Sequence, residues 1–282
     1  VYVNGTKVGE NHYGYNDFAF DISKYLTCDG TTENVISVKV VHQTPSSRWY
    51  SGSGIYRDVE LIVTDAVHVS RNGTYVTTPN LATEKDGDVT VKVQTDVQND
   101  SSAQAAAQIR TTVLDAEGKA VSKAVTTDVT LAANSTAEKE QTLKVNKPAL
   151  WSTENPNLYY VQTEVLVDGK VKDTYKTTYG FRYINFDANT GFSLNGKNVK
   201  LKGVCMHHDQ GALGAASERD AVYRQVKKLK EMGCNAIRTS HNTPSSVLLE
   251  ACNELGMMVM DETFDGWAFP KNGNSQDFST HF

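Results

Sequence analysis

The chain has 282 residues, of which 39% are hydrophobic, and its 28 basic and 33 acidic side chains give a net charge of −5. This length allows two or more globular domains, and the composition excludes a disordered chain. No basic block is large enough to cover a binding face, so nucleic acid is not an expected partner. No apolar run reaches the ~18 residues of a membrane span.

Residues 1–64 have the pattern of short β-strands. Asn4-Gly5 stands between two strand-like pairs, and this dipeptide strongly favours a tight hairpin turn. Apolar runs predict further strands at 18–22, 35–41 and 59–63. The loop at 47–59 is rich in glycine and aromatic residues, which sets it apart from the predicted strands around it.

Residues 65–183 have a different pattern, with few aromatic side chains and regular alternation. Four segments alternate apolar and polar residues, as strands with one buried face do: 89–95, 107–113, 124–131 and 159–167. Turn pairs such as Asp168-Gly169 separate these segments. A spacing of roughly 10–15 residues between strands is typical of a small β-sandwich. We therefore predict a scaffold here.

Residues 184–282 alternate short apolar runs with amphipathic segments, which predicts β/α units of a parallel sheet. Val204, Ala236 and Val259 mark the centres of three strands. The two connections are long enough for helical crossovers, and such crossovers are nearly always right-handed. The segment therefore has the order of the first units of a β/α barrel.

Local signals predict where the two helices begin and end. Ser217 is the expected cap of the first helix, and Thr243 is the expected cap of the second, with Pro244 in its first turn. Gly233 and Gly256 suit the left-handed residue that ends a helix.

Polar, reactive residues follow each predicted strand. They are His207, His208 and Asp209; Arg238, Ser240, His241 and Asn242; and Asp261 and Glu262. The carboxyl ends of barrel strands lie on one face, and barrel enzymes carry their chemistry there. We therefore expect a functional site at these strand ends.

These motifs resemble glycoside hydrolase family 2, and within it the bacterial β-galactosidases. Asn235-Ala-Ile-Arg-Thr-Ser-His241, followed by Asn253-Glu-Leu-Gly256 and the pair Asp261-Glu262, is similar to the family's first signature. LKGVCMHHD at 201–209 and DETFDGW at 261–267 resemble the ends of its first and third barrel strands. One departure is visible, since Asn242-Thr243-Pro244 stands where the family usually has Tyr-Pro or Asn-Pro.

The resemblance implies a multidomain β plus α/β architecture. Residues 1–64 would be the end of a jelly-roll sugar-binding β-sandwich, 65–183 an immunoglobulin-like β-sandwich, and 184–282 the first βα units of an incomplete (β/α)8 TIM barrel. A closed barrel needs eight strands, so the chain is expected to be a fragment of a longer protein. The remainder of the barrel, supplied by a separate chain, and a homo-oligomer are both considered as partners.

The resemblance also implies an activity, which is retaining hydrolysis of terminal β-D-galactosides. Family members use two glutamates on later barrel strands, and neither motif occurs here, so no catalytic residue is assigned. His207, His241, Asn242 and Trp267 are the predicted substrate-binding residues. Arg238, Asp261 and Glu262 are predicted to support the barrel mouth, with both acids paired to Arg238.

Two further expectations concern neighbours of these residues. His208 should point away from His207, because successive side chains of a strand alternate, and it is therefore expected to be structural. A minor hypothesis is that Arg48, Trp49 and Tyr50 reach the barrel mouth from the first domain.

Alternative functions remain open from the sequence. His207, His208, Asp209, His241 and Asp261 are ligand types of a metal-dependent barrel hydrolase, but adjacent histidines on a strand diverge. Gly266 and Ala268 stand near positions where the family's metal ligands are expected, so neither metal nor cofactor is predicted from this segment, and a metal ion in the full-length enzyme stays open. A non-catalytic carbohydrate-binding or adhesion module and another β-glycosidase, such as a β-glucuronidase, also fit. The compartment stays open between bacterial cytoplasm and cell surface or secretion.

Overall fold

A computed structural model describes residues 1–42 and 52–265 and divides into two compact units. The first, here called the split unit, combines Val1–Val59 with Lys202–Cys252 and the residues from Met257. The second, here called the sandwich unit, contains Glu60–Leu201 and the short stretch Asn253–Gly256. The sandwich unit is therefore inserted in the sequence between the two halves of the split unit.

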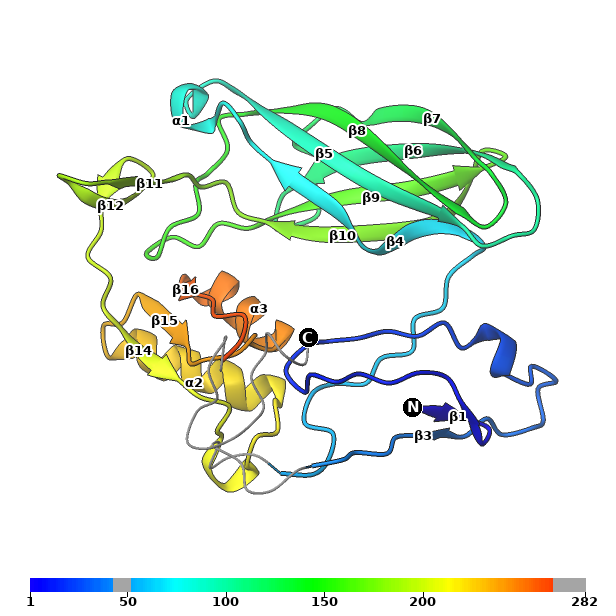
Figure 1. Cartoon of the computed structure of the whole chain (residues 1–282). Coiled ribbons are helices and arrows are strands. Elements are labelled where there is room, and N and C mark those ends of the chain that lie inside the picture. Colours follow the sequence, from blue (N-terminus) through cyan, green and yellow to red (C-terminus); the bar gives the residue numbers. More distant parts are fainter. Residues whose placement is uncertain (43–51, 266–282) are drawn as a thin grey trace. The chain divides into compact units, whose positions relative to one another are not determined.

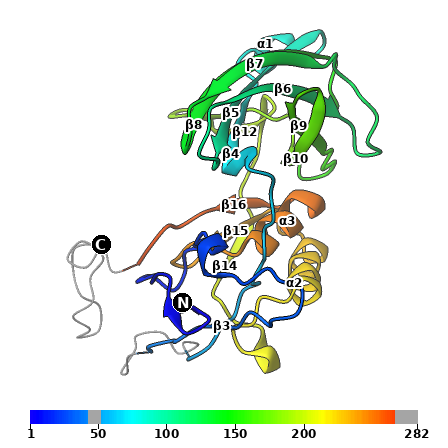
Figure 2. The ribbon, with the colours of Figure 1, turned by 90° about the vertical axis from the view of Figure 1, so that its right-hand side faces the viewer.

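The sandwich unit contains two facing antiparallel sheets (Figures 1 and 2). Its three-stranded sheet has the order β4 (Val67–Thr77), β5 (Asp88–Asn99), β8 (Ser135–Asn146). Its four-stranded sheet has the order β10 (Lys170–Tyr179), β9 (Tyr159–Val167), β6 (Ala105–Leu114), β7 (Val125–Leu131). The short helix α1 (Leu81–Glu84) connects β4 to β5.

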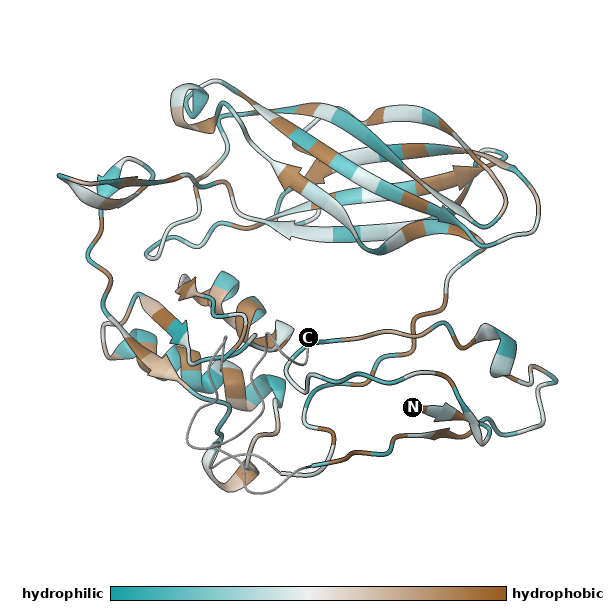
Figure 3. Ribbon diagram, in the orientation of Figure 1, coloured by the Kyte–Doolittle hydropathy of each residue, from teal (hydrophilic) through white to brown (hydrophobic). Residues whose placement is uncertain are grey.

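Alternation along the strands creates the sandwich core. On β5, Val89, Val91 and Val93 are fully buried while the residues between them are more exposed, and Figure 3 shows this as alternating colours. Two apolar clusters result. One buried polar side chain, Gln141, bonds to the sheet opposite its own. Gln141 of β8 accepts a hydrogen bond from Thr111 of β6 at 2.6 Å and donates to the Ile109 carbonyl at 3.0 Å. These bonds satisfy polar atoms that burial would otherwise penalise.

The four predicted sandwich segments are strands, but the alternation did not reveal the other three. β10 has no fully buried residue, and β8 buries apolar side chains only in its second half. β10 pairs with β9 and β8 pairs with β5 along their length, and a period-two hydrophobic pattern does not report such ladder hydrogen bonds. The turn at Asp168-Gly169 has φ values of 51° and 71°, as that pair predicts.

In the N-terminal part of the split unit, the Asn4-Gly5 hairpin is confirmed. It joins β1 (Tyr2–Val3) to β2 (Thr6–Lys7), and β1 also pairs with β3 (Ile36–Ser37). The predicted strands at 18–22 and 59–63 are wrong, and 35–41 is reduced to β3. An extended apolar run becomes a strand only where a neighbour supplies ladder hydrogen bonds, and no described residue pairs with these runs. A short 3-10 turn, η1 (Ser23–Tyr25), follows the first of them.

A small meander ends the inserted sequence. It contains β11 (Ile184–Asp187), β12 (Gly191–Leu194) and β13 (Lys197–Asn198). Its last turn is the pair Asn195-Gly196, with φ values of 53° and 77°.

The second half of the split unit is a parallel sheet with its crossover helices, as predicted (Figure 1). β14 (Gly203–Met206), β15 (Ala236–Thr239) and β16 (Met258–Met260) are adjacent in chain order. A 3-10 turn, η2 (Gly211–Leu213), and the helix α2 (Arg219–Glu231) connect the first pair, and α3 (Ser246–Leu255) connects the second. No helix among residues 1–42 and 52–265 is long and apolar enough to cross a membrane.

The predicted helix caps are displaced, whereas the predicted helix ends are confirmed. The Ser217 hydroxyl donates to Ser245 Oγ at 2.8 Å, and α2 begins after Glu218 without a side-chain cap. Ser245 takes the place expected of Thr243, because its hydroxyl accepts from the Leu248 N–H at 3.3 Å. Several serines and threonines lie near each start, and sequence alone does not select among them. The terminating residues Gly233 and Gly256 have φ values of 91° and 70°.

Candidate functional site

The ends of β14 and β15 bring two histidines together. The parallel register pairs Met206 with Thr239, so the residues that follow these two strands emerge side by side. The His207 and His241 rings lie with centroids 5.8 Å apart and planes at 88°. His207, His241, Arg238 and Glu262 are called the strand-end cluster below.

Glu262, just beyond β16, links the cluster together. Its carboxylate lies 2.6 Å from His241 Nδ1 and accepts a hydrogen bond from Arg238 Nε. Because a carboxylate only accepts, this contact places a proton on His241 Nδ1, and Arg238 Nη2 lies 3.2 Å from the same nitrogen. The Glu262 N–H donates to Thr239 Oγ1 at 2.8 Å, which fixes the carboxylate beside β15.

Local electrostatics keep Glu262 and Arg238 ionised. Partial burial alone would raise the pKa of Glu262, but the hydrogen bonds from His241 and Arg238 outweigh it and leave that pKa below its ordinary value. The Arg238 pKa is raised by its contacts with the Cys205 thiol and with Glu262. In turn, the hydrogen bond from Arg238 lowers the pKa of the Cys205 thiol, which lies 3.5 Å from Nη1. The expected ion pair of Arg238 with Glu262 is therefore present.

Asp261 does not share that ion pair, contrary to expectation. Its carboxylate lies 3.5 Å from Thr239 Oγ1, and burial raises its pKa. Adjacent residues of an extended segment point to opposite sides, so Asp261 and Glu262 cannot both face Arg238. Sequence proximity had suggested a shared role that the alternation of side chains rules out.

His208 points away from the cluster and is surrounded by the N-terminal segment. The Tyr15 ring centroid lies 5.0 Å from that of His208, and the Tyr56 ring stands edge-on at 6.1 Å. The Arg57 guanidinium lies 3.2 Å from His208 Nε2. Burial, and then the nearby Arg57 charge, lower the pKa of His208 to about 4, so this ring is neutral near pH 7.

Asn242 is 2% exposed, and its orientation is set from the N-terminal segment. Tyr13 donates its phenolic proton to the Asn242 amide oxygen. The amide nitrogen makes no hydrogen bond within the described part of the chain. Asn242 thus follows His241 in the chain, and its side chain is bonded to Tyr13. Its predicted contact with substrate stays a prediction.

Three residues that sequence reasoning did not assign to the site, Tyr13, Tyr56 and Arg57, border these strand ends. For Tyr56 and Arg57 the available signal was the loop at 47–59, which is rich in glycine and aromatic residues, whereas no sequence signal singled out Tyr13. The residues selected from that loop, Arg48, Trp49 and Tyr50, lie outside the described residues, and so does the predicted ligand contact Trp267.

Within residues 1–42 and 52–265, no group of three or more His, Cys, Asp or Glu side chains lies in an arrangement that could hold a metal ion. His207 and His208 point to different surroundings, as alternation along a strand predicts.

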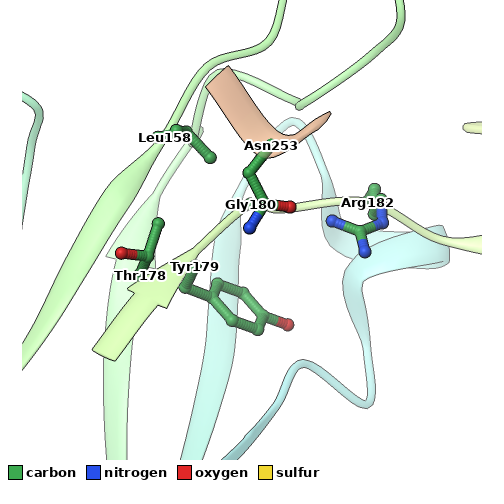
Figure 4. A pocket seen from close by; sticks show the side chains of 6 residues that line it. All are labelled: Leu158, Thr178, Tyr179, Gly180, Arg182 and Asn253. Atoms are coloured by element: carbon green, nitrogen blue, oxygen red, sulfur yellow. The ribbon is translucent and has the colours of Figure 1, made fainter. Parts of the chain in front are cut away.

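The sandwich unit has a hollow of its own, of about 310 Å³ (Figure 4). Leu158, Thr178, Tyr179, Gly180, Arg182 and Asn253 line it. Arg182 stacks on the Trp151 ring at 4.8 Å, and burial lowers its pKa. The lining offers no carboxylate or imidazole, so the strand-end cluster remains the better candidate for sugar chemistry.

Comparison with known protein families assigns most of the chain. The model described as "Glycosyl hydrolases family 2" matches residues 67–182, and the one described as "Glycosyl hydrolases family 2, TIM barrel domain" matches residues 188–280. The first match covers the strands of the sandwich, and the second covers the parallel strands with their helices.

Individual relatives agree with these matches. The beta-galactosidase BoGH2A of Bacteroides ovatus is 40% identical over 283 residues, matching 100% of this chain and 32% of that protein. A putative beta-glucuronidase of Formosa agariphila is 40% identical over 268 residues, matching 95% of this chain and 24% of that protein. A crystal structure of a glycosyl hydrolase family 2 member from Bacteroides cellulosilyticus superposes with a TM-score of 0.92 at 40% identity, covering 100% of this chain and 35% of that one. The chain thus spans about a third or less of the length of these relatives.

Proposed function

Because the chain belongs to glycosyl hydrolases family 2, we propose that it forms part of a longer retaining β-galactosidase that removes terminal β-D-galactosyl residues. Its glycosidase relatives support the hydrolytic class. The domain boundaries at residues 64 and 183 are part of the proposal. So is the division into jelly-roll end, immunoglobulin-like sandwich and first barrel units.

The single observation that carries the site assignment is the perpendicular pair His207 and His241 at adjacent strand ends. With Nδ1 of His241 committed to Glu262, its Nε2 is left to bond a sugar hydroxyl. We assign His207 and His241 to hydroxyls of the galactosyl ring, and Asn242 and Trp267 to its periphery. Arg238, Glu262 and Asp261 act as supports.

Retaining hydrolysis needs two carboxyl groups about 5–5.5 Å apart, one as acid/base and one as nucleophile. In our proposal neither is Glu262, because Arg238 and His241 already hold its carboxylate. Nor is either Asp261, which faces the Thr239 hydroxyl instead. The catalytic pair is therefore assigned to other strands of the complete barrel, and the 282-residue chain by itself is expected to be inactive.

A β-glucuronidase is the second candidate, because several relatives carry that name. A glucuronide differs from a galactoside in carrying a carboxylate on its ring, which a protein recognises best with an uncommitted cation. Both arginines described at these strand ends are committed, since Arg238 is paired with Glu262 and Arg57 donates to two backbone carbonyls. Neutral hydroxyl recognition by imidazoles therefore favours the galactoside.

The test compares chromogenic β-galactoside and β-glucuronide hydrolysis by the longer protein and by this chain alone. We expect the longer protein to prefer the galactoside, to release product with retained anomeric configuration, and to differ from an inactive chain. Hydrolysis by the chain alone would overturn the assignment of the catalytic pair. Sugar binding without hydrolysis by the longer protein would instead favour a non-catalytic carbohydrate-binding module.

A further inference from the structure

Arg57 connects segments of the split unit that lie far apart in the sequence. Its Nη1 donates to the Tyr15 carbonyl at 2.6 Å, and its Nη2 donates to the Thr243 carbonyl at 2.6 Å. The same Nη2 lies 3.2 Å from His208 Nε2. One guanidinium thus contacts the N-terminal segment and the two strand ends at once.

The two strand-end contacts are next to the residues proposed to bind sugar. His208 directly follows His207 after β14, and Thr243 comes two residues after His241 beyond β15. A planar guanidinium presents its N–H groups in a rigid fork, so its bonds fix both distance and direction. Holding His208 and Thr243 on one nitrogen therefore restrains the spacing between the His207 and His241 rings.

The chemistry of the His208 contact is defined by its partner. A guanidinium can only donate, so in this contact His208 Nε2 is the acceptor. Burial and the adjacent positive charge hold His208 neutral, which preserves this acceptor. The Tyr15 and Tyr56 rings pack on His208 from the N-terminal half, and Tyr56 OH donates to the Gly14 carbonyl at 2.8 Å.

Independent contacts support the same loop. Tyr13 donates to Asn242, and Thr243 Oγ1 contacts Asn16 Oδ1 at 3.5 Å. The Ser217 N–H donates to the Tyr56 carbonyl at 2.8 Å, which anchors Tyr56, next to Arg57, to the start of α2. The N-terminal segment therefore contacts the loop after β15 through both side chains and backbone.

We propose that Arg57 is a positioning residue for the sugar site, setting the relative placement of His207 and His241 through His208 and Thr243. The inference rests on the proposed β-galactosidase function. It gives residues 13–16 and Arg57 a part in substrate affinity, although none of them is assigned a contact with the sugar.

The test is steady-state kinetics of Arg57→Met, Arg57→Lys, His208→Gln and His208→Phe in the longer protein, with a chromogenic β-galactoside. Misplaced binding groups raise KM, so Arg57→Met should raise KM about 10- to 100-fold while kcat stays within about threefold. Arg57→Lys should recover part of the loss, because an ammonium still donates to Thr243. His208→Gln offers an amide oxygen to Arg57 and should stay near the wild-type KM, whereas His208→Phe should resemble Arg57→Met.

The control is Arg110→Met, which removes an arginine whose Nε donates to Glu164 at 2.7 Å within the sandwich unit. Its KM should not change. If Arg57→Met lowers the thermal midpoint but leaves KM unchanged, Arg57 is merely structural and the inference is wrong. Should Arg57→Met fail to fold, the His208 pair decides, since equal KM values for Gln and Phe overturn the inference. A wild-type longer protein that hydrolyses no β-glycoside overturns the proposed function, and with it this inference.

Discussion

The imidazoles of His207 and His241 meet at nearly a right angle, with 5.8 Å between their ring centroids. The two residues belong to different β/α units and become neighbours only because β14 and β15 pair in parallel. Glu262, from beyond the third strand, then holds His241 Nδ1 at 2.6 Å. Three strand ends thus contribute to one cluster of side chains, in which His241 and Glu262 are hydrogen-bonded.

This arrangement predicts that His207→Ala and His241→Ala each weaken substrate binding by the longer protein. Each loses hydrogen bonds to sugar hydroxyls, and about 1.4 kcal/mol corresponds to tenfold in affinity, so KM should rise roughly tenfold or more. Steady-state kinetics with a β-galactoside measures the change. His12→Ala, at an exposed histidine near the N-terminus, is the matched control and should leave KM unchanged. Unaltered KM values for both site variants would contradict the sugar-binding assignment.

Glu262→Gln should lower the thermal midpoint at neutral pH. The folded pKa of Glu262 is depressed below its ordinary value of 4.5, so its stabilising contribution is complete above that pH and is lost as pH falls through the folded value. The gap between wild type and Glu262→Gln should therefore close below pH 4.5, as measured by thermal denaturation of the chain.

Asp261→Asn provides a control of opposite sign. Burial raises the pKa of Asp261 above its ordinary 3.8, so its ionised form destabilises the fold at neutral pH. Removing that charge should raise the thermal midpoint at pH 7, with the gain vanishing in acid. Parallel pH dependence of the two variants would show that the carboxylates are not held in different environments.

Trp151→Ala should strongly destabilise the sandwich unit. The side chain is 2% exposed, donates from Nε1 to the Asn253 carbonyl at 2.9 Å, and stacks under Arg182. Truncating a buried tryptophan costs about 3–5 kcal/mol, which urea unfolding should detect. Tyr75→Ala, at a residue 65% exposed, is the control and should stay within about 0.5 kcal/mol.

Gly203→Ala should disturb the pairing of β14 with β15. A Cβ at Gly203 would lie 2.2 Å from the Ala236 carbonyl oxygen, a backbone atom that cannot move alone. The expected cost is about 1–3 kcal/mol in urea unfolding, as for other overpacked sites. Gly14→Ala has no atom within 4 Å of the added carbon and serves as the control. Equal stability of the two variants would mean that β14 and β15 can move apart to accommodate a Cβ at Gly203, contrary to this prediction.

Cys205 should be alkylated more readily than Cys252. It is exposed, and Arg238 lowers its thiol pKa, whereas burial raises the pKa of Cys252 to about 12. The thiolate is the nucleophile, so iodoacetamide at pH 7 should modify Cys205 first, as followed by peptide mass spectrometry. Arg238→Met should slow that reaction. Modification of Cys252 at the same rate would contradict the assigned burial.

Sequence patterns predicted those parts of the fold where burial follows a regular period. The strands around Val91, Val161 and Ile237 carry apolar residues at the expected spacing, and turns such as Asn4-Gly5 use the residues their φ angles require. β10 was not predicted because none of its residues is fully buried, although it pairs with β9 along its length. The predicted strand at 59–63 failed for the converse reason, since its apolar residues have no described ladder partner.

The sequence predicted which site residues follow each strand, but not which distant segments contact them. Motif positions identified His207, His241 and Glu262, and the structure brings these three side chains together. The contribution of Tyr13 and Arg57 depends on contacts between segments separated by the whole sandwich, and no local spacing encodes those. Asp261 shows the opposite error, because adjacency to Glu262 does not imply a shared partner.

The insertion of Glu60–Leu201 between the two halves of the split unit has a consequence for biosynthesis. Residues up to Val59 leave the ribosome first, yet their partners from Lys202 onward emerge only after the sandwich has been translated. The sandwich can complete its ladder cotranslationally, while residues 1–59 still lack these partners. A nascent chain stalled near Leu201 is therefore expected to recruit chaperones through residues 1–59.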